Sequence, residues 1–437
     1  MAPIQSKTYW NPLGPYSVPY NCYEVAHPWN VNCAESSLKL FLHCYEESLK
    51  IYTPLYVASL IYGRQFDKQN LVRTLQSILT SSTFLSINAG SFLACFCTIR
   101  QLTGNFSLMS TACTPGFVAS LLAILVERPA RRKQLAVYTC NMASEVIYNM
   151  IKFRGWITPI PHFEKFMFAV SAGVYLWLCQ KGHTHPNDPV KRMFQFVVGD
   201  DEFTKGQGVP AHEVSISGNQ LQQGSGDHQK SLHNDVRSSC YGYVVQGFAR
   251  SFFAGWLLRA VLCLIATQSL SKTIRYKEAY KFGMFLGSFG AIFRGVNCFL
   301  RYRGYSPQNR AGIAGCLAAL SMFFSGSPSM ALYLAWKALE GAYGAYGRPI
   351  PGASELLYSL STAMLFYAAV FEPHNLRPTY WKFMNRISYD RFTYVNRKIF
   401  DMYGVQSSKL FGDFWPRLDM DHVSKELTER ILIWVPF

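Results

Sequence analysis

Charged side chains are scarce in this chain of 437 residues. Lysine, arginine, aspartate and glutamate make up 16% of it, whereas a soluble protein normally carries about a quarter charged residues. The shortage is not uniform, because residues 78–99 and 106–126 contain no charged residue at all. Each run has the length that an α-helix needs to cross a bilayer, about 20 residues. An ordinary soluble fold is therefore excluded.

Eight further apolar stretches are candidate spans. They are residues 49–62, 135–151, 166–180, 243–268, 280–300, 311–325, 330–346 and 353–371. Some are short enough to be buried half-spans, which leaves a range of eight to ten crossings. These long runs lack the ten-residue alternation of membrane β-barrels. We predict an all-α polytopic integral membrane protein with about ten helices.

Sequence motifs for catalysis and targeting are also missing. The N-terminal 20 residues have no apolar core of a signal peptide. The patterns G-x-S-x-G, H-E-x-x-H and G-x-x-x-x-G-K-[ST] are absent, which removes the common hydrolase, metalloprotease and nucleotide-binding signatures. We expect no enzyme activity and no cofactor.

The two hydrophobic halves resemble each other. Cys44-Tyr45 recurs as Cys240-Tyr241, Gly116 as Gly312, Glu145 as Glu340, and Pro159-Ile160-Pro161 as Pro349-Ile350-Pro351. The order is the same throughout and the offset drifts slowly, which indicates an internal duplication. We predict two related five-helix units. An odd number of spans would invert the second unit, as in many transporters, and the basic residues of two of the three loops favour inversion.

These features divide the chain into five parts. The predicted parts are an N-terminal cysteine-containing segment 1–43, a first membrane unit 44–199, a polar disordered linker 200–239, a second membrane unit 240–374 and a basic aromatic segment 375–437.

Small residues at four-residue spacing predict close helix contacts. The glycines concerned are Gly90, Gly116, Gly283, Gly287, Gly290, Gly312 and Gly315. They serve helix packing or, as an alternative, line a groove. Ionisable residues within spans are the candidates for a polar site: Glu145, Glu340, Lys337 and Arg294. The open alternatives are structural ion pairs and a path for a polar substrate or ion.

The C-terminal segment mixes bases with aromatic residues. Such mixtures suit the headgroup region, where anionic lipids attract lysine and arginine. The candidate lipid contacts are Arg377, Lys382, Arg386, Arg391, Arg397 and Lys398. The alternative is a tail that docks a partner protein; no nucleic acid is expected.

The N-terminal cysteines recur at equal intervals. Cys22, Cys33 and Cys44 lie eleven residues apart, with His27 and His43 in the same segment. A zinc site normally shows a closer C-x(2–4)-C pair. Free thiols are the default interpretation, with a disulfide and a metal as alternatives. Cys97, in an apolar span, is interpreted as an ordinary buried thiol.

Several stretches resemble the transmembrane protein 135 family. They are NCYEVAHPWNVNC, EESLKIYTPLY, TPGFVASLLAILVERPARR, FGMFLGSFGAIFRGVNCFLR, LRPTYWKF and NRKIFDMYG. Residues 311–371 also resemble a smaller peroxisomal membrane protein family, of the superfamily of mitochondrial inner-membrane translocase channels.

The resemblance implies a multi-pass protein of mitochondrial and peroxisomal membranes. It implies a role in the balance of mitochondrial fission and fusion through the dynamin-related GTPase, in peroxisome organisation and in lipid metabolism. The duplication and the paired glutamates suggest an alternative from another class, a transporter or channel for a lipid-related metabolite with its site between the repeats.

Overall fold

The computed structural model describes residues 17–63, 66–185, 188–199, 202–203, 228–267, 277–348, 350–405, 407–410 and 418–430. Within these residues the secondary structure is helical, apart from an isolated antiparallel bridge between Val18 and Phe106. The described residues of each of the ten apolar stretches lie mainly on helices. The chain is an all-α polytopic membrane protein.

The first half of the chain runs from α1 to α7. Its elements are α1 (Cys22–Val25), α2 (Cys33–Gly63), α3 (Lys68–Thr103), a π-helical turn (Met109–Cys113), α4 (Thr114–Val126), α5 (Pro129–Phe153), α6 (Phe163–Gln180) and α7 (Pro189–Val198).

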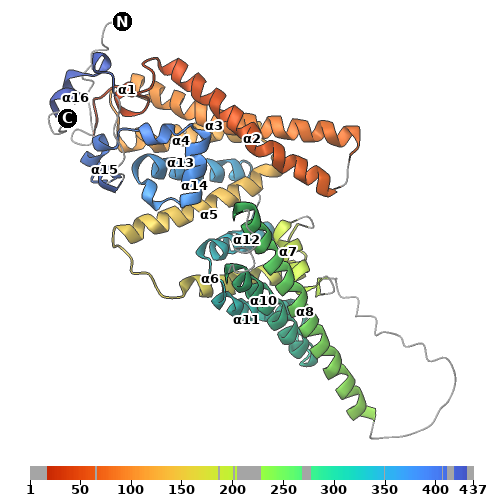
Figure 1. The fold of residues 1–437 in the computed structure, drawn as a ribbon. Helices are drawn as coiled ribbons and strands as arrows, with labels where there is room; N and C mark the ends of the chain where they lie inside the picture. Colours follow the sequence, from red (N-terminus) through yellow and green to blue (C-terminus); the bar gives the residue numbers. More distant parts are fainter. Residues whose placement is uncertain are drawn as a thin grey trace. The chain divides into compact units, whose positions relative to one another are not determined.

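The second half begins at α8 (Figure 1). Its main helices are α8 (His228–Thr267), α10 (Lys277–Tyr302), α11 (Pro307–Ala318), α12 (Pro328–Tyr346), α13 (Ala353–Phe371) and α14 (Pro378–Ile387). The short elements are the 3-10 turns Ala319–Phe323, Pro373–Asn375, Arg391–Tyr394, Arg397–Tyr403 and Met420–His422, with α15 (Ser407–Leu410) and α16 (Lys425–Arg430).

Among the described residues, proline is the first residue of five α-helices, namely α5, α7, α11, α12 and α14. The residue before it caps the helix with its side chain in α7, α11 and α12, where Asp188, Ser306 and Ser327 accept backbone N–H groups. Proline is tolerated at this position because the N–H group that it lacks would have no intrahelical partner there. In α5 and α14 the preceding residue is an arginine instead.

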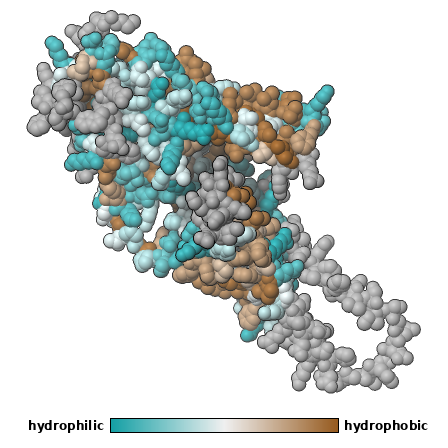
Figure 2. All heavy atoms as spheres, viewed as in Figure 1, coloured by the Kyte–Doolittle hydropathy of each residue, from teal (hydrophilic) through white to brown (hydrophobic). Residues whose placement is uncertain are grey.

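Among the residues that the structure describes, five helical stretches are long and apolar enough to cross a membrane. They are Lys68–Thr103, Met109–Val126, Cys240–Leu264, Lys277–Tyr302 and Ala353–Phe371. Apolar side chains lie on the outer surface of these helices, including Leu122, Phe253 and Leu360, and Figure 2 shows hydrophobic residues on the surface of the molecule. Lipid is the solvent that such a surface requires.

Two compact units divide the chain, but not where the sequence suggested. One contains Met1–Thr158 with Ile350–Phe437, and the other contains Pro159–Pro349. In the first, α3 packs on α2 and α4, and α13 packs on α4 and α5. In the second, α10 packs on α8 and α11, and α6 packs on α11 and α12.

The same packing pattern therefore occurs twice, with the fifth helix exchanged. Helix α6 belongs to the first repeat by sequence but packs with helices of the second, and α13 does the converse. The units 44–199 and 240–374 predicted from the sequence differ from the compact units for this reason. The predicted linker 200–239 lies largely outside the described residues, and α8 begins inside it at His228.

Glycines permit the contacts on which this exchange depends. A Cβ on Gly116 of α4 would lie 3.2 Å from the backbone of Ala363 in α13, and one on Gly315 of α11 would lie 3.1 Å from the carbonyl oxygen of Ala172 in α6. Close packing of this kind drives helix association in a membrane. Lipid tails are as apolar as the helix side chains, so burial of apolar surface gives no driving force there.

Candidate functional site

The four predicted polar residues lie in three clusters, because Lys337 and Glu340 share one. Glu145 of α5 is in the first unit, where its carboxylate accepts a 2.7 Å hydrogen bond from Nε of Arg377. The Nη2 of Arg377 donates to the same oxygen. Arg377 is the residue just before α14. Both groups are three-quarters or more buried, at 24% and 20% side-chain exposure.

In the second unit, Lys337 of α12 lies between two carboxylates. Its ammonium is 2.7 Å from Asp188 and 2.7 Å from Glu340. Asp188 caps α7, accepting the N–H of Val190 through its other oxygen. The lysine and Asp188 are each more than nine-tenths buried. Glu340 therefore pairs along its own helix with the lysine three residues before it.

The two clusters correspond between the repeats. In one unit a charged residue of α5 binds the residue just before α14, and in the other a charged residue of α12 binds the residue just before α7. Helices α14 and α7 are both ten residues long and begin with proline. The sign is reversed, because Glu145 binds an arginine whereas Lys337 binds an aspartate. An ion pair removed from water is favourable only when each charge is fully partnered, so both clusters fasten a short amphipathic helix to its unit.

Arg294 of α10 is buried and holds the second unit together. Its Nε donates to the carbonyl of Val198 at 2.6 Å, its Nη1 donates to the carbonyl of Tyr243 at 2.9 Å, and its guanidinium lies 4.3 Å from the centre of the Tyr243 ring. These contacts join α10 to α8 and to the end of α7.

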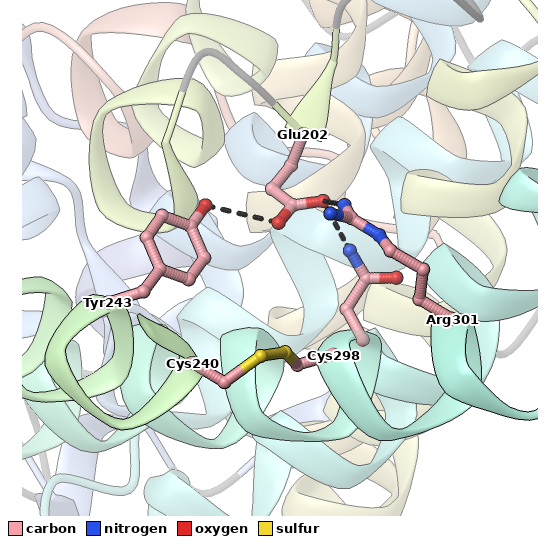
Figure 3. The surroundings of a disulfide bond; sticks show 6 residues. Glu202, Cys240, Tyr243, Cys298 and Arg301 are labelled. Atoms are coloured by element: carbon pink, nitrogen blue, oxygen red, sulfur yellow. Dashed lines mark hydrogen bonds and ion pairs between the residues drawn. A yellow bond between two sulfur atoms is a disulfide. The ribbon is translucent and has the colours of Figure 1, made fainter. Parts of the chain in front are cut away.

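A disulfide lies beside this region (Figure 3). Cys240 of α8 and Cys298 of α10 are bonded, and Glu202 nearby accepts hydrogen bonds from Tyr243, Asn297 and Arg301. In the sequence, Cys240 is notable only as part of the Cys-Tyr pair that marks the repeat. Cysteines 58 residues apart on two different helices carry no spacing signal for such a pairing.

The predicted glycines all lie at helix contacts. An added Cβ would come within 2.9 Å of Phe41 at Gly90, of Phe252 at Gly283 and within 3.0 Å of Phe252 at Gly287. At Gly290 it would meet the carbonyl oxygen of Val197 at 2.8 Å. Gly312 is looser, with its nearest neighbour at 3.5 Å.

The basic tail is not uniformly available to lipid. Lys382 and Arg386 are exposed, and Arg386 lies 3.1 Å from Glu47. Arg377 binds Glu145, and Arg391 packs over the ring of Trp29. The tail also contributes Met384, Ile399 and Phe400 to the core of the first unit, so part of it packs inside that unit.

Arg397 corrects the prediction most clearly. It is 1% exposed, and its guanidinium donates to the carbonyls of Ala369, Val370 and Phe392 at 3.0–3.2 Å. The first two are last-turn carbonyls of α13, which have no partner within their helix. Burial lowers the pKa of Arg397 to about 9, so the group stays charged at neutral pH. It caps α13 and cannot contact a headgroup. Lys398 is half-buried.

A polar hollow of about 360 Å³ lies in the first unit. It is lined by Phe153, Arg154, Glu372, His374, Gly404 and Val405. Arg154 forms an ion pair with Glu372, which also accepts a 2.8 Å hydrogen bond from Asn375. Burial lowers the pKa of His374 below its usual value. No residue of this hollow was singled out in the sequence.

Within the described part of the chain, two N-terminal cysteines, a histidine and Cys97 form a close group of potential metal ligands. The Sγ atoms of Cys22, Cys33 and Cys97 and a ring nitrogen of His27 all lie within 4.8 Å of one another. Cys97 Sγ is 3.4 Å from His27 Nε2. Cys22, His27 and Cys97 are buried and Cys33 is half-buried. Cys44 and His43 lie outside the group: Cys44 Sγ contacts the carbonyl of Leu85, and His43 packs on Tyr389.

Local and long-range hydrogen bonds hold this N-terminal segment in place. Asn21 and Glu24 form a capping box on α1, and Asn32 accepts the first N–H groups of α2. From α3, the guanidinium of Arg100 donates to the carbonyls of Pro19 and Tyr20 at 2.7 and 2.8 Å. Cys97 lies one turn before Arg100, and this clamp brings it to the other three.

Comparison with known proteins bears on the same part of the chain. Residues 19–152 match the family model described as the N-terminal cysteine-rich region of Transmembrane protein 135. The matched range includes Cys22, His27, Cys33 and Cys97. No solved structure matches the chain. The family resemblance stated from the sequence is confirmed over these residues: the chain is a multi-pass membrane protein that carries the N-terminal cysteine-rich region of the transmembrane protein 135 family.

Proposed function

We propose that the protein is a non-enzymatic regulator in organelle membranes. It acts on the balance of mitochondrial fission and fusion, on peroxisome organisation and on lipid metabolism, and it resides in mitochondrial and peroxisomal membranes. The support for this role is the family resemblance, which the match over residues 19–152 strengthens.

The observation that favours a scaffold over a transporter is the state of the intramembrane charges. Glu145 and Glu340 each have a cation partner inside their own compact unit. A carboxylate that is already paired with a buried base has little affinity for a polar substrate, because substrate binding would first have to break the ion pair. The role of these residues is to hold helices together.

The proposed partners are the bilayer and a fission GTPase of the dynamin-related class. Exposed bases of α14, namely Lys382 and Arg386, provide a contact for anionic headgroups, each worth about 1 kcal/mol near such a surface. The buried Arg397 takes no part.

Cells lacking the protein test the proposal. We expect elongated mitochondria on its loss, restored by the wild-type chain and by K382Q/R386Q only in part. The E145Q/R377Q variant tests the Glu145–Arg377 ion pair. If this variant reaches normal levels in the membrane and restores mitochondrial length, the pair has a purely structural role.

The transporter alternative predicts a different result. The polar hollow at Arg154 and His374 is the feature that would serve it. Purified chain in liposomes should then move a lipid-related metabolite, and R154Q should abolish the flux without loss of folded protein. Flux with unaltered mitochondrial length on deletion would overturn the regulator proposal.

A further inference from the structure

We propose that Cys22, His27, Cys33 and Cys97 bind a structural zinc ion. Three thiolates and one imidazole are a donor set that zinc accepts in closed four-coordinate sites. The proposal is independent of the function proposed above, since it rests only on the positions of these four side chains.

The separations of the donor atoms match a tetrahedral site. With Zn–S near 2.3 Å and Zn–N near 2.0 Å, ligand atoms at tetrahedral angles are about 3.5–3.8 Å apart. The one separation resolved individually, Cys97 Sγ to His27 Nε2, is 3.4 Å, and all four donor atoms lie within 4.8 Å of one another. Small rotations of the side chains therefore complete the coordination shell.

The orientation of His27 is the second observation. Its Nδ1 lies 2.8 Å from the carbonyl oxygen of Asn30, so Nδ1 carries the proton and donates it. That leaves the lone pair of Nε2 facing Cys97. Histidines that bind metals are held in this way by a carbonyl or carboxylate on the far nitrogen, which selects the tautomer and the ring orientation.

Burial and charge also suit a bound ion. His27 is fully buried and Cys97 is 3% exposed, in a core that includes Val18, Phe96 and Phe106. Zinc with three thiolates has a net charge of −1, and the guanidinium of Arg100 lies one helical turn from Cys97. On binding, the thiols release their protons to solvent. Half-buried Cys33 provides the side from which an ion enters.

The ion would fasten the N-terminal segment to the membrane unit. It joins α1 and the start of α2 to α3, and α1 is itself the dock for the C-terminal segment. The N–H of Asn396 donates to the carbonyl of Val25 at 2.9 Å, and the N–H of Asp419 donates to the hydroxyl of Tyr23 at 2.7 Å. Loss of the ion should therefore loosen both ends of the chain.

Metal analysis of the full-length protein tests this. The chain is purified in detergent under reducing conditions, its zinc content is measured, and Co²⁺ is exchanged into it. We expect one zinc per chain and, with Co²⁺, thiolate charge-transfer and tetrahedral d–d bands.

Matched variants separate the four ligands from other cysteines. C97S and C33S should lose zinc and the cobalt bands, whereas C95S, two residues away on α3, and C44S, in α2, should keep both. H27A should lose the ion, while H27C should regain it with stronger thiolate bands. Removal of zinc by a chelator from the wild-type chain should expose three additional cysteines to maleimide, a result that needs no variant to fold.

Two results would overturn the proposal. One is a reduced wild-type chain that holds no zinc and gives no cobalt bands. The other is a disulfide, found by peptide mapping without reductant, between any two of Cys22, Cys33 and Cys97.

Discussion

The ammonium of Lys337 in α12 lies 2.7 Å from the carboxylate of Asp188, the residue that caps α7. In the other unit Arg377, at the start of α14, binds Glu145 of α5 with the charges reversed. Two copies of one helical arrangement thus use the same connection with opposite signs. The connection, rather than the particular side chains, is the feature common to both repeats.

Breaking the Lys337 pair should destabilise the protein strongly. K337M leaves Asp188 buried without its cation, a loss of about 3–5 kcal/mol, and D188N in the same chain should recover part of it. Unfolding of the purified protein by SDS measures both effects. The control is K281M, whose exposed pair with Glu278 is worth about 0–1 kcal/mol; equal losses at the two lysines would contradict the argument.

Two glycines of α11 should respond differently to alanine. G315A places a Cβ 2.7 Å from Leu176 and 3.1 Å from the carbonyl oxygen of Ala172, and overpacking of this kind costs about 1–3 kcal/mol. G312A meets nothing closer than 3.5 Å and should be neutral or stabilising by up to about 1 kcal/mol, since alanine favours helix. Thermal unfolding in detergent compares the pair, and the reverse order would show that α6 packs elsewhere.

The exchange of the fifth helix can be tested by a cross-link. Cys140 of α5 has its Sγ 3.1 Å from Oγ of Ser361 in α13, so S361C should form a disulfide with Cys140 on mild oxidation. S359C, two residues earlier in α13, is the control and should not. Peptide mapping without reductant identifies the bond. If α13 packed only with its own repeat, neither variant would cross-link to α5.

Arg397 should be needed for the end of α13. R397M removes the donors to the carbonyls of Ala369 and Val370, and each buried carbonyl left without a partner costs about 1–3 kcal/mol. R397K keeps the positive charge but lacks the planar guanidinium with its several donors, so R397K should be only partly as destabilising as R397M. Hydrogen exchange at the C-terminal turn of α13 reports the change directly. A fully stable R397M would show that this arginine does not cap the helix.

The polar hollow should make stability fall in mild acid. Burial depresses the pKa of His374 in the folded chain, whereas in the unfolded chain it protonates near pH 6.5. Because the unfolded state then binds more protons, stability decreases as the pH falls through about 6.5 and levels off below the folded pKa. H374Q should flatten that part of the profile between pH 7 and 5. An unchanged slope in the variant would exclude His374 as the source.

The cysteine cluster could not be predicted in full from the sequence. In the sequence, Cys22, Cys33 and Cys44 recur at equal intervals with His27 and His43 in the same segment, but the close C-x(2–4)-C pair of a zinc site is missing and free thiols are the default interpretation. The missing donor is Cys97, which reads as an ordinary apolar thiol because its helix is apolar on either side of it. Only the clamp from Arg100 to the carbonyls of Pro19 and Tyr20 brings it to the other three.

The basic tail illustrates the same limit for charge. Its composition predicts a headgroup surface, and nothing in the order of residues distinguishes exposed Lys382 from buried Arg397. The difference arises because the last carbonyls of α13 require a donor and Arg397 is the base within reach.

Composition and periodicity by themselves determined the class of this protein. Long uncharged runs without the ten-residue alternation of a β-barrel indicate membrane helices, because lipid satisfies no backbone hydrogen bond, and the repeated order of Cys-Tyr, glycine and glutamate predicts the duplication. Only the tertiary structure decided which helices share a unit, which charges pair and which thiols meet. Those outcomes depend on contacts between residues tens to hundreds of positions apart, and patterns in the local sequence do not predict such contacts.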